Sequence, residues 1–324
     1  MSTQADRGTV EPDDHLRTVR QVTLPERVAE LADAYDRYFG ERDRFLWRWI
    51  YSLFPSFTLS SVAEAHAAHV REQKTVLTMY VTVLDDLIEH RGDRATFREA
   101  RRLACDTVDP DPERAAVDAE TFAFVERLWT EFEGGLEDAP RREAFADVFA
   151  YDFDQTADAM EYSALVSDNP CMANLTGATR YDSHNMVMFP YADVDLMYSP
   201  AFDRRDLGGV RDTLWDLQEM ARIGNWLTTW EREIGESDYS AGVVVAAIEE
   251  GVVSADELSA ADDREAVVDA VRESGLEARF RERWERIRDE VRTRRLDVES
   301  VDVAGLVAGM ETVFEYHLAS EGLK

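Results

Sequence analysis

The spacing of three oxygen-bearing side chains in one segment predicts a metal site. Asn225, Thr229 and Glu233 lie at positions i, i+4 and i+8 of the stretch GNWLTTWEREIGE. A helix would align an amide, a hydroxyl and a carboxylate along one face over about 12 Å. All three offer the hard oxygen ligands that Mg²⁺ prefers, and none offers the thiolate or imidazole that favours zinc. We therefore expect these residues to contribute to a magnesium site.

A second acidic cluster lies 140 residues earlier, where Asp85, Asp86 and Glu89 follow the apolar run TVLTMYVTVL. On a helix Asp85 and Glu89 share a face about 6 Å apart, which suits the bridging of hard cations. The alternative is a helix that simply ends at solvent beside the basic residues that follow. The chain is so acidic that composition alone gives roughly 0.7 matches to D-D-x-x-[DE], against roughly 0.04 for the Asn-Thr-Glu pattern. The Asn225 motif is therefore the more specific of the two.

Two arginines could capture an anion held by these oxygens. Arg232 precedes Glu233 directly, and Arg180 lies forty-five residues before the Asn motif in TGATRYDSHNMVMF. Guanidinium groups match phosphate oxygens in charge and geometry. Each arginine also has a purely structural alternative, because Arg232 could pair with an acidic neighbour on its own helix and Arg180 with Asp182.

The balance of charges predicts an acidic, hydrated surface. The net charge is −31, and only two of the 36 basic residues are lysines, Lys74 and Lys324. This bias is typical of proteins from salt-saturated cytoplasm, so we expect a halophilic source, where salt at about 1 M reduces the Debye length to about 3 Å. No basic patch interleaved with aromatic residues is present, which argues against a nucleic-acid partner.

The remaining composition predicts a soluble cytoplasmic protein. Only two cysteines occur, no N-terminal apolar segment resembles a signal peptide, and no apolar run approaches the 18 residues of a membrane span. With 45% apolar residues in 324, the chain can form a large core.

The pattern along the chain predicts one all-α domain at 25–324, preceded by a flexible N-terminal arm at 1–24. Alternating strand patterns and internal repeats are absent from the sequence, and glycine and proline fall mainly at breaks between helical runs. The expected helices are 25–39, 42–53, 60–91, 94–107, 112–133, 140–167, 173–189, 206–235, 239–251, 262–295 and 301–319. Two of the long expected helices are 60–91 and 206–235. They carry the two motifs near their C-terminal ends.

Together these motifs resemble those of class I terpene synthases, particularly the compact single-domain microbial cyclases. The Asp85-Asp86-x-x-Glu89 segment is similar to the family's aspartate-rich motif, and Asn225-x-x-x-Thr229-x-x-x-Glu233 is similar to its second metal motif. Their separation, the position of an arginine at 180, the chain length and the helical pattern also match, so the resemblance covers nearly the whole chain.

The resemblance implies a class I terpenoid synthase bundle around an apolar active-site cavity. In that family three Mg²⁺ ions bind between the motifs and a prenyl diphosphate, here farnesyl or geranylgeranyl diphosphate. The implied metal ligands are Asp85, Asp86, Glu89, Asn225, Thr229 and Glu233, although Asp86 could pair with an arginine instead. Arg180, Arg232 and Tyr316 would bind the diphosphate, with Asp85 and Arg180 as catalytic residues. Departure of diphosphate would leave an allylic carbocation that cyclises in a dry cavity, and a homodimer is possible.

Aromatic residues near the motifs are candidates for the cavity lining, although core packing explains most of them equally well. They are Phe54, Phe57, Tyr80, Trp226 and Tyr316. Ring faces would stabilise a carbocation without trapping it.

Two positions depart from the family pattern. Glu315-Tyr316 replaces the usual Arg-Tyr pair, and Ser183 and His184 follow Arg180 where small or acidic residues are common. The alternatives to a cyclase are therefore a catalytically silent protein that binds isoprenoid diphosphates, and a prenyltransferase-like isoprenoid enzyme. Chain-elongating prenyltransferases carry two aspartate-rich motifs, whereas this chain has Asn-Thr-Glu in the second position.

Overall fold

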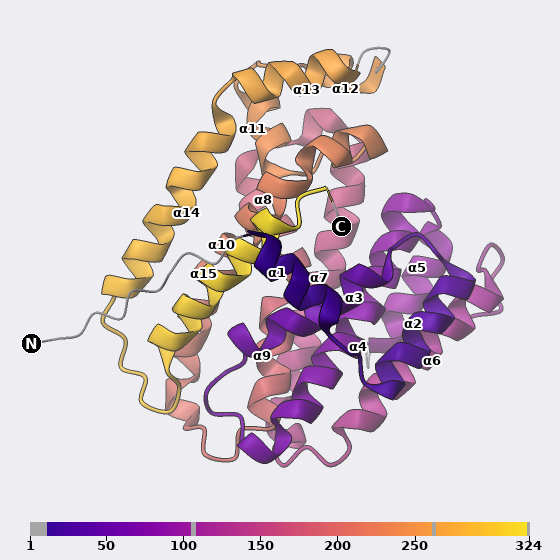
Figure 1. Ribbon diagram of the computed structural model, residues 1–324. Helices are drawn as coiled ribbons and strands as arrows, with labels where there is room; N and C mark the ends of the chain where they lie inside the picture. The colour runs from indigo at the N-terminus through magenta and orange to yellow at the C-terminus, as the bar shows by residue number, and fades with distance from the viewer. Residues whose placement is uncertain (1–11, 105–107, 261–263, 323–324) are drawn as a thin grey trace, which may run out of the picture.

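Helices from all parts of the chain pack together in the computed structural model, which describes residues 12–104, 108–260 and 264–322 (Figure 1). These residues contain no β-strand, which confirms the predicted all-α fold. The α-helices are α1 (Pro12–Gln21), α2 (Glu26–Tyr38), α3 (Arg44–Leu53), α4 (Ala67–Asp85), α5 (Arg94–Ala100), α6 (Ala119–Leu136), α7 (Arg142–Asp168), α8 (Leu175–Arg180), α9 (Met188–Met197), α10 (Leu207–Glu236), α11 (Gly242–Glu249), α12 (Ala255–Ala260), α13 (Arg264–Glu273), α14 (Leu276–Thr293) and α15 (Val303–Ala319). Shorter helical segments are η1 (Phe54–Ser56), η2 (Glu64–His66), η3 (Asp86–His90), η4 (Arg101–Ala104), η5 (Pro170–Met172), η6 (Asp182–Met186) and η7 (Arg204–Asp206).

The inner helix α9 is buried at every position from Met188 to Met197, because α4, α7 and α10 all pack against it. A helix surrounded on all sides is expected to be apolar all round. Yet α9 contains Asp195, which pairs with Lys74 of α4 at 3.0 Å, both side chains being completely buried. The pair joins α4 to α9, and each charge neutralises the other away from solvent.

The long helix α10 connects the outer layer to the interior by packing against α14, α15 and η6. Helix α14 runs along the outside of the bundle (Figure 1) and buries Phe280, Trp284, Ile287 and Val291. Those are the positions of the apolar stripe expected on its amphipathic face, so the stripe is confirmed.

Two expected long helices are each interrupted by a residue in the left-handed conformation. In 262–295 the break is Gly275, with φ of 76°, which separates α13 from α14. In 173–189 the break is Val187, with φ of 57°, between η6 and α9. A β-branched residue is strained in this region, so the surrounding packing must hold Val187 there. Helix periodicity alone gave no sign of either interruption.

The expected flexible arm at 1–24 requires a correction for its second half. Pro12–Gln21 forms α1, which packs against α3 and α15, and Val19 is completely buried. Pro12 is the first described residue of the helix. The tertiary contacts, rather than a long apolar pattern, fix this short helix; residues 1–11 lie outside the described part of the chain.

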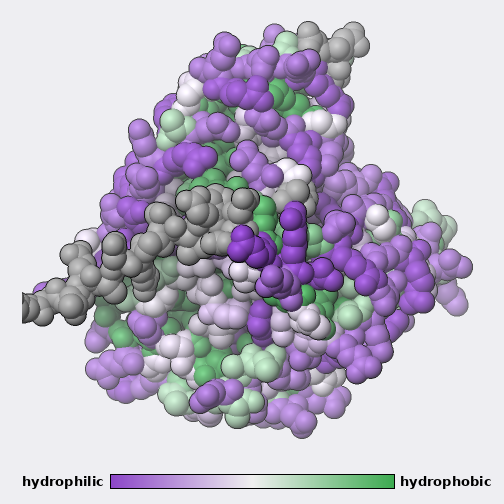
Figure 2. Space-filling model, viewed as in Figure 1, coloured by the Kyte–Doolittle hydropathy of each residue, from purple (hydrophilic) through white to green (hydrophobic). Residues whose placement is uncertain are grey.

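The face of the molecule seen in Figure 2 agrees with the expected hydrated exterior. Figure 2 shows one face that is mostly hydrophilic, with apolar residues visible in scattered places. None of the described helices is long and apolar enough to cross a membrane.

Close packing of α15 against η1 depends on one glycine. A Cβ atom on Gly309 would overlap the backbone carbonyl of Ser56, whereas a Cβ on Gly134 in α6 would meet nothing within 4 Å. We predict that Gly309→Ala lowers the free energy of unfolding by about 1–3 kcal/mol, because backbone must move to admit the methyl group. Gly134→Ala, the matched control, should leave stability unchanged or raise it by up to about 1 kcal/mol. Thermal unfolding followed by circular dichroism measures both, and equal melting temperatures for the two variants would contradict the packing described here.

Candidate active site

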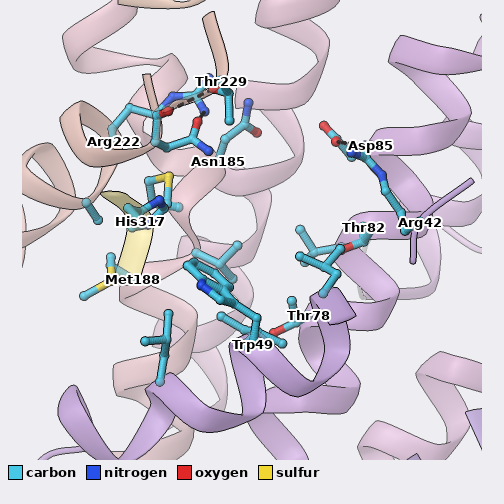
Figure 3. Close-up of a pocket in the computed structure, with 18 of the residues that line it drawn as sticks. Arg42, Trp49, Thr78, Thr82, Asp85, Asn185, Met188, Arg222, Thr229 and His317 are labelled. Atoms are coloured by element: carbon cyan, nitrogen blue, oxygen red, sulfur yellow. Dashed lines mark hydrogen bonds and ion pairs between the residues drawn. The ribbon is translucent and has the colours of Figure 1, made fainter. Parts of the chain in front are cut away.

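A cavity of about 250 Å³ opens between α3, α4, α9, α10 and α15. Figure 3 shows its two ends: Asp85, Arg42, Arg222 and Thr229 surround one end, whereas Trp49 and Thr78 lie toward the other. The apolar and aromatic lining comes from Leu46, Trp49, Ile50, Leu53, Phe57, Val81, Met160, Met186, Val187, Met188, Tyr191, Ala221, Met310 and Val313. The cavity is therefore polar and charged at one end and largely apolar elsewhere.

Both predicted metal motifs contribute to the polar end. Asp85 and Glu89 line it from α4 and η3, and Asn225, Thr229 and Glu233 line it from α10. In Figure 3 Asp85 and Thr229 lie on opposite walls. Five of the six residues expected to bind metal thus line one cavity, although the motifs are 140 residues apart in the sequence.

The sixth residue, Asp86, is not in the cavity wall. Its side chain is completely buried and accepts hydrogen bonds from the Tyr35 hydroxyl at 2.6 Å and from Arg42 Nε at 2.9 Å. Asp85 lines the cavity, whereas the contacts of Asp86 with Tyr35 and Arg42 hold its carboxylate among α2 and the segment that follows it. The expectation that Asp86 binds metal is therefore corrected in favour of its pairing with an arginine.

The backbone widens where the first motif leaves α4. Residues Asp86–His90 form a π-helical turn, closed by a 2.9 Å bond from Arg91 N to the Asp86 carbonyl. Such turns are rare in proteins, and those that occur often lie at functional sites. The turn contains Asp86, which faces the protein interior, and Glu89, which lines the cavity.

On the opposite wall, α10 presents its ligands in different states of hydrogen bonding. The Asn225 amide oxygen accepts from Arg222 Nη1 at 2.8 Å, and the Thr229 hydroxyl donates to the Asn225 backbone carbonyl at 2.9 Å. Glu233 is 9% exposed, and its Oε2 has no hydrogen-bond partner among the described residues. Arg232 pairs with Glu236 and lies with its Nη2 3.8 Å from Glu233 Oε1.

Burial makes the ionised carboxylates at this end costly. Burial raises the pKa of Asp85, with Arg42 acting in the opposite direction. The pKa of Glu89 is raised well above its ordinary value by burial and then by the negative charges of Asp85 and Asp238. Burial followed by Asp238 raises the pKa of Glu233 to about 7. A cation bound among these groups would offset both the cost of burying their negative charges and the repulsion between them.

Asp238 is a carboxylate of the cavity that the sequence motifs did not indicate. It lines the same end and is held by Ser167 Oγ and Ser240 N, each at 2.9 Å. It follows Glu233 by five residues but lies beyond the end of α10, so helical spacing could not place it.

The chemical types of these residues suit a hard divalent cation. They supply carboxylate, amide and hydroxyl oxygens, an unpartnered Glu233 oxygen and a surplus of buried negative charge. In the described ranges, however, no group of three His, Cys, Asp or Glu side chains is arranged to hold an ion by itself. Ligands from the opposite wall or from a bound molecule would have to complete the coordination.

The arginine expected from the sequence is not the one that lines the cavity. Arg180 is exposed at the end of α8 and lies outside the cavity wall. Arg222, only 8% exposed, lines it instead and pairs with Asp182 through Nε and Nη2, both at 2.7 Å. The expected role of Arg180 is therefore corrected. The position of Arg222, three residues before Asn225 on the same helix face, was a signal that could have identified it.

A second arginine of the cavity, Arg42, lies in the segment between α2 and α3 and bridges the first motif. Its Nη2 is 3.5 Å from Asp85 and 2.8 Å from Asp86. No local sequence pattern distinguishes it, because its partners lie more than forty residues away.

Tyr316 also lies outside the cavity wall. Its ring packs against His15 of α1 at 4.4 Å between centroids, and the next residue, His317, lines the cavity. Of the five aromatic candidates only Phe57 is in the wall; the others pack in the core or against α1. The rings that the sequence analysis missed are Trp49 and Tyr191, whose apolar surroundings resemble those of any core residue.

Comparison of the sequence with models of known protein families and with curated proteins finds no match.

The raised pKa of Glu233 predicts an inverse dependence of stability on pH. The folded protein retains this proton to about pH 7, whereas an unfolded glutamic acid releases it near 4.5. The contribution of Glu233 to the free energy of unfolding therefore falls as the pH rises from 4.5 to about 7, and it is constant above pH 7. Glu233→Gln should be the more stable protein at pH 8, by about 3 kcal/mol, with the difference disappearing below pH 4.5. Melting temperatures across this range in EDTA test the expectation; Glu265→Gln, an exposed position on α13, is the control. A Glu233→Gln variant that is less stable at pH 8 would contradict it.

Proposed function

We propose that this protein is a Mg²⁺-dependent terpene cyclase, a lyase that ionises a linear C15 or C20 prenyl diphosphate and releases a cyclic terpene and diphosphate. One observation carries the proposal. Two oxygen-rich motifs from distant parts of the chain line one end of a cavity whose remaining wall is apolar and aromatic. A prenyl diphosphate has the same division, because its diphosphate is charged and its branched hydrocarbon chain is apolar.

Magnesium would be held by Asp85 and Glu89 on one wall and by Asn225, Thr229 and Glu233 on the other. When bound with the diphosphate, it would withdraw negative charge from the leaving group. The proposal requires phosphate oxygens among the ligands, because the walls alone gather no three acidic or histidine side chains around one point in the described chain.

Three arginines of the wall would bind and orient the diphosphate. Arg222 is buried and Arg42 is partly buried, each held by an aspartate, and Arg232 is more exposed than either. A guanidinium already held in position loses little freedom when it binds an anion. Their positive charges would stabilise the departing group while the hydrocarbon stays at the other end.

The apolar end would hold the hydrocarbon chain and exclude water. Trp49, Phe57, Met188 and Met310 contribute to that wall. A carbocation formed there would meet ring faces and aliphatic groups in place of bulk water, so cyclisation and proton loss would precede hydrolysis.

A catalytically silent protein that binds isoprenoid diphosphates is the second candidate. It is favoured by the hydrogen bond from Arg222 to the Asn225 amide oxygen, which occupies an expected metal ligand. Binding of diphosphate without turnover would distinguish this function from the cyclase.

We predict that the protein, assayed in multimolar KCl with Mg²⁺, converts geranyl, farnesyl or geranylgeranyl diphosphate to a cyclic product detectable by gas chromatography with mass detection. EDTA should abolish the product. Asn225→Ala and Glu233→Ala should each lower its formation at least about 100-fold, because both remove ligands needed in the transition state. Asn169→Ala, at an exposed position after α7, is the control. Full activity in the first two variants would exclude the proposed site. Tight binding without product would favour the silent protein, and a lengthened diphosphate in the presence of isopentenyl diphosphate would favour a prenyltransferase.

The finding that Arg222, and not Arg180, lines the cavity gives a separate prediction. Arg222→Lys retains the charge but loses the two-point pairing with Asp182, so we expect the Kd for Mg²⁺-diphosphate to rise about tenfold. Arg180→Lys should change that Kd less than twofold, because Arg180 lies outside the wall. Isothermal titration calorimetry measures both, with circular dichroism to confirm folding. A larger effect at Arg180 would contradict the placement of these two arginines.

A further inference from the structure

Hydroxyl groups interrupt the apolar part of the cavity on α4 and α9. Thr78 of α4 and Tyr191 of α9 both line the wall, and Figure 3 shows Thr78 at the end away from Asp85 and Thr229. Seven residues of helix separate Thr78 from Asp85, a rise of about 10 Å. The two hydroxyls are therefore distant from the carboxylates of the polar end.

The direction of hydrogen bonding between these hydroxyls is fixed by their partners. The Thr78 hydroxyl donates to the Lys74 carbonyl at 2.7 Å, and its oxygen lies 2.7 Å from the Tyr191 oxygen. Each hydroxyl has one proton to donate. Because Thr78 gives its proton to Lys74, Tyr191 must be the donor of the second bond. The lone pairs of the Tyr191 oxygen then remain, and no other described group donates to them.

Tyr191 is held firmly in this orientation. Its ring makes an edge-to-face contact with Phe54 at 5.1 Å, and the Lys74 ammonium lies 5.9 Å from the ring centroid. Asp195 contacts that ammonium through both oxygens at 3.0 Å, so the buried pair adds no net charge behind the ring. The result is a phenol oxygen that can only accept, set in an aromatic and aliphatic wall.

An acceptor that cannot turn its proton toward the cavity favours ligands with positive charge or a donor group. Both kinds of ligand lose hydration on entering an apolar cavity. Only a ligand with a cationic centre is also stabilised by the nearby ring faces, and a branched hydrocarbon around that centre fits the apolar wall. We infer that the Tyr191 oxygen, oriented by Thr78, stabilises positive charge in the apolar part of the cavity, which therefore binds a branched hydrocarbon cation. This inference deepens the proposed function, on which its role in a reaction rests, because the oxygen would stabilise the cyclising carbocation.

Binding of a stable cation tests the inference without turnover. The probes are protonated N,N-dimethylfarnesylamine and the neutral hydrocarbon in which carbon replaces its nitrogen. Their Kd values are measured by tryptophan fluorescence in EDTA at fixed KCl. Tyr191→Phe should weaken binding of the ammonium probe about tenfold, as expected for loss of a hydrogen-bond-type contact to a charge, and change binding of the hydrocarbon less than twofold. The hydrocarbon value also reports whether the cavity of the variant remains intact.

Variants of Thr78 distinguish the oriented oxygen from the mere presence of tyrosine. Thr78→Val removes the acceptor of the Tyr191 proton, so the phenol is free to rotate, and ammonium binding should weaken although Tyr191 is unchanged. Thr78→Ser should restore it. Tyr80→Phe, at a buried tyrosine outside the wall that donates to Ala100, is the control and should have no effect.

Two outcomes would overturn the inference. One is equal weakening of both probes by Tyr191→Phe. The other is weakening of the ammonium probe by Asp85→Asn but not by Tyr191→Phe, which would place the positive charge at the carboxylate end. Neither outcome depends on product formation, so failure of the cyclase assay and failure of this inference are separate results.

Discussion

Each wall at the charged end of the cavity contains an arginine that is largely shielded from solvent and paired with an aspartate whose side chain has no exposure. Arg42 pairs with Asp86 on the side of α4, and Arg222 pairs with Asp182 on the side of α10. A buried charge without a partner costs several kcal/mol, so each arginine and its aspartate must stay together for the wall to form. These pairs join segments that are 40 or more residues apart, and the positions of both motifs follow from them.

The same pairs explain why the cavity keeps a surplus of negative charge. Since each arginine is shared with its own aspartate, the cavity-facing carboxylates of Asp85, Glu89 and Glu233 are only partly compensated. The net charge of −31 on the whole chain adds further negative potential, although concentrated salt screens it. A cavity of this kind repels a free anion and accepts one together with cations, which matches a diphosphate that arrives with metal.

The sequence predicted the residues that depend on helical spacing and missed those that depend on helical rotation or tertiary contact. Asn225, Thr229 and Glu233 were found because residues four apart share a face of one continuous helix. Asp86 and Tyr316 were each misplaced, since one step along a helix turns the side chain by about 100° and only packing fixes the phase. Arg180 was misplaced for another reason, because α8 ends there and a buried ion pair selects Arg222.

Breaks in the helices were equally beyond sequence reasoning. The left-handed Val187 lines the cavity and sets the start of α9, yet valine disfavours that conformation. Packing therefore overrides local preference at a position where the cavity is shaped. The π-helical turn after Asp85 is a similar case, because no residue type in DLIEH favours it over an ordinary α-helical turn.

The burial of Lys74 has a consequence for how this protein can be modified. Lys74 is the only lysine in the described part of the chain, and it has no exposure to solvent. Every exposed side-chain cation of that part is therefore an arginine or a histidine. Acetylation, glycation and amine-directed crosslinkers therefore find no exposed lysine among the described residues, and the positive charge there is not lost in the pH range in which lysines titrate.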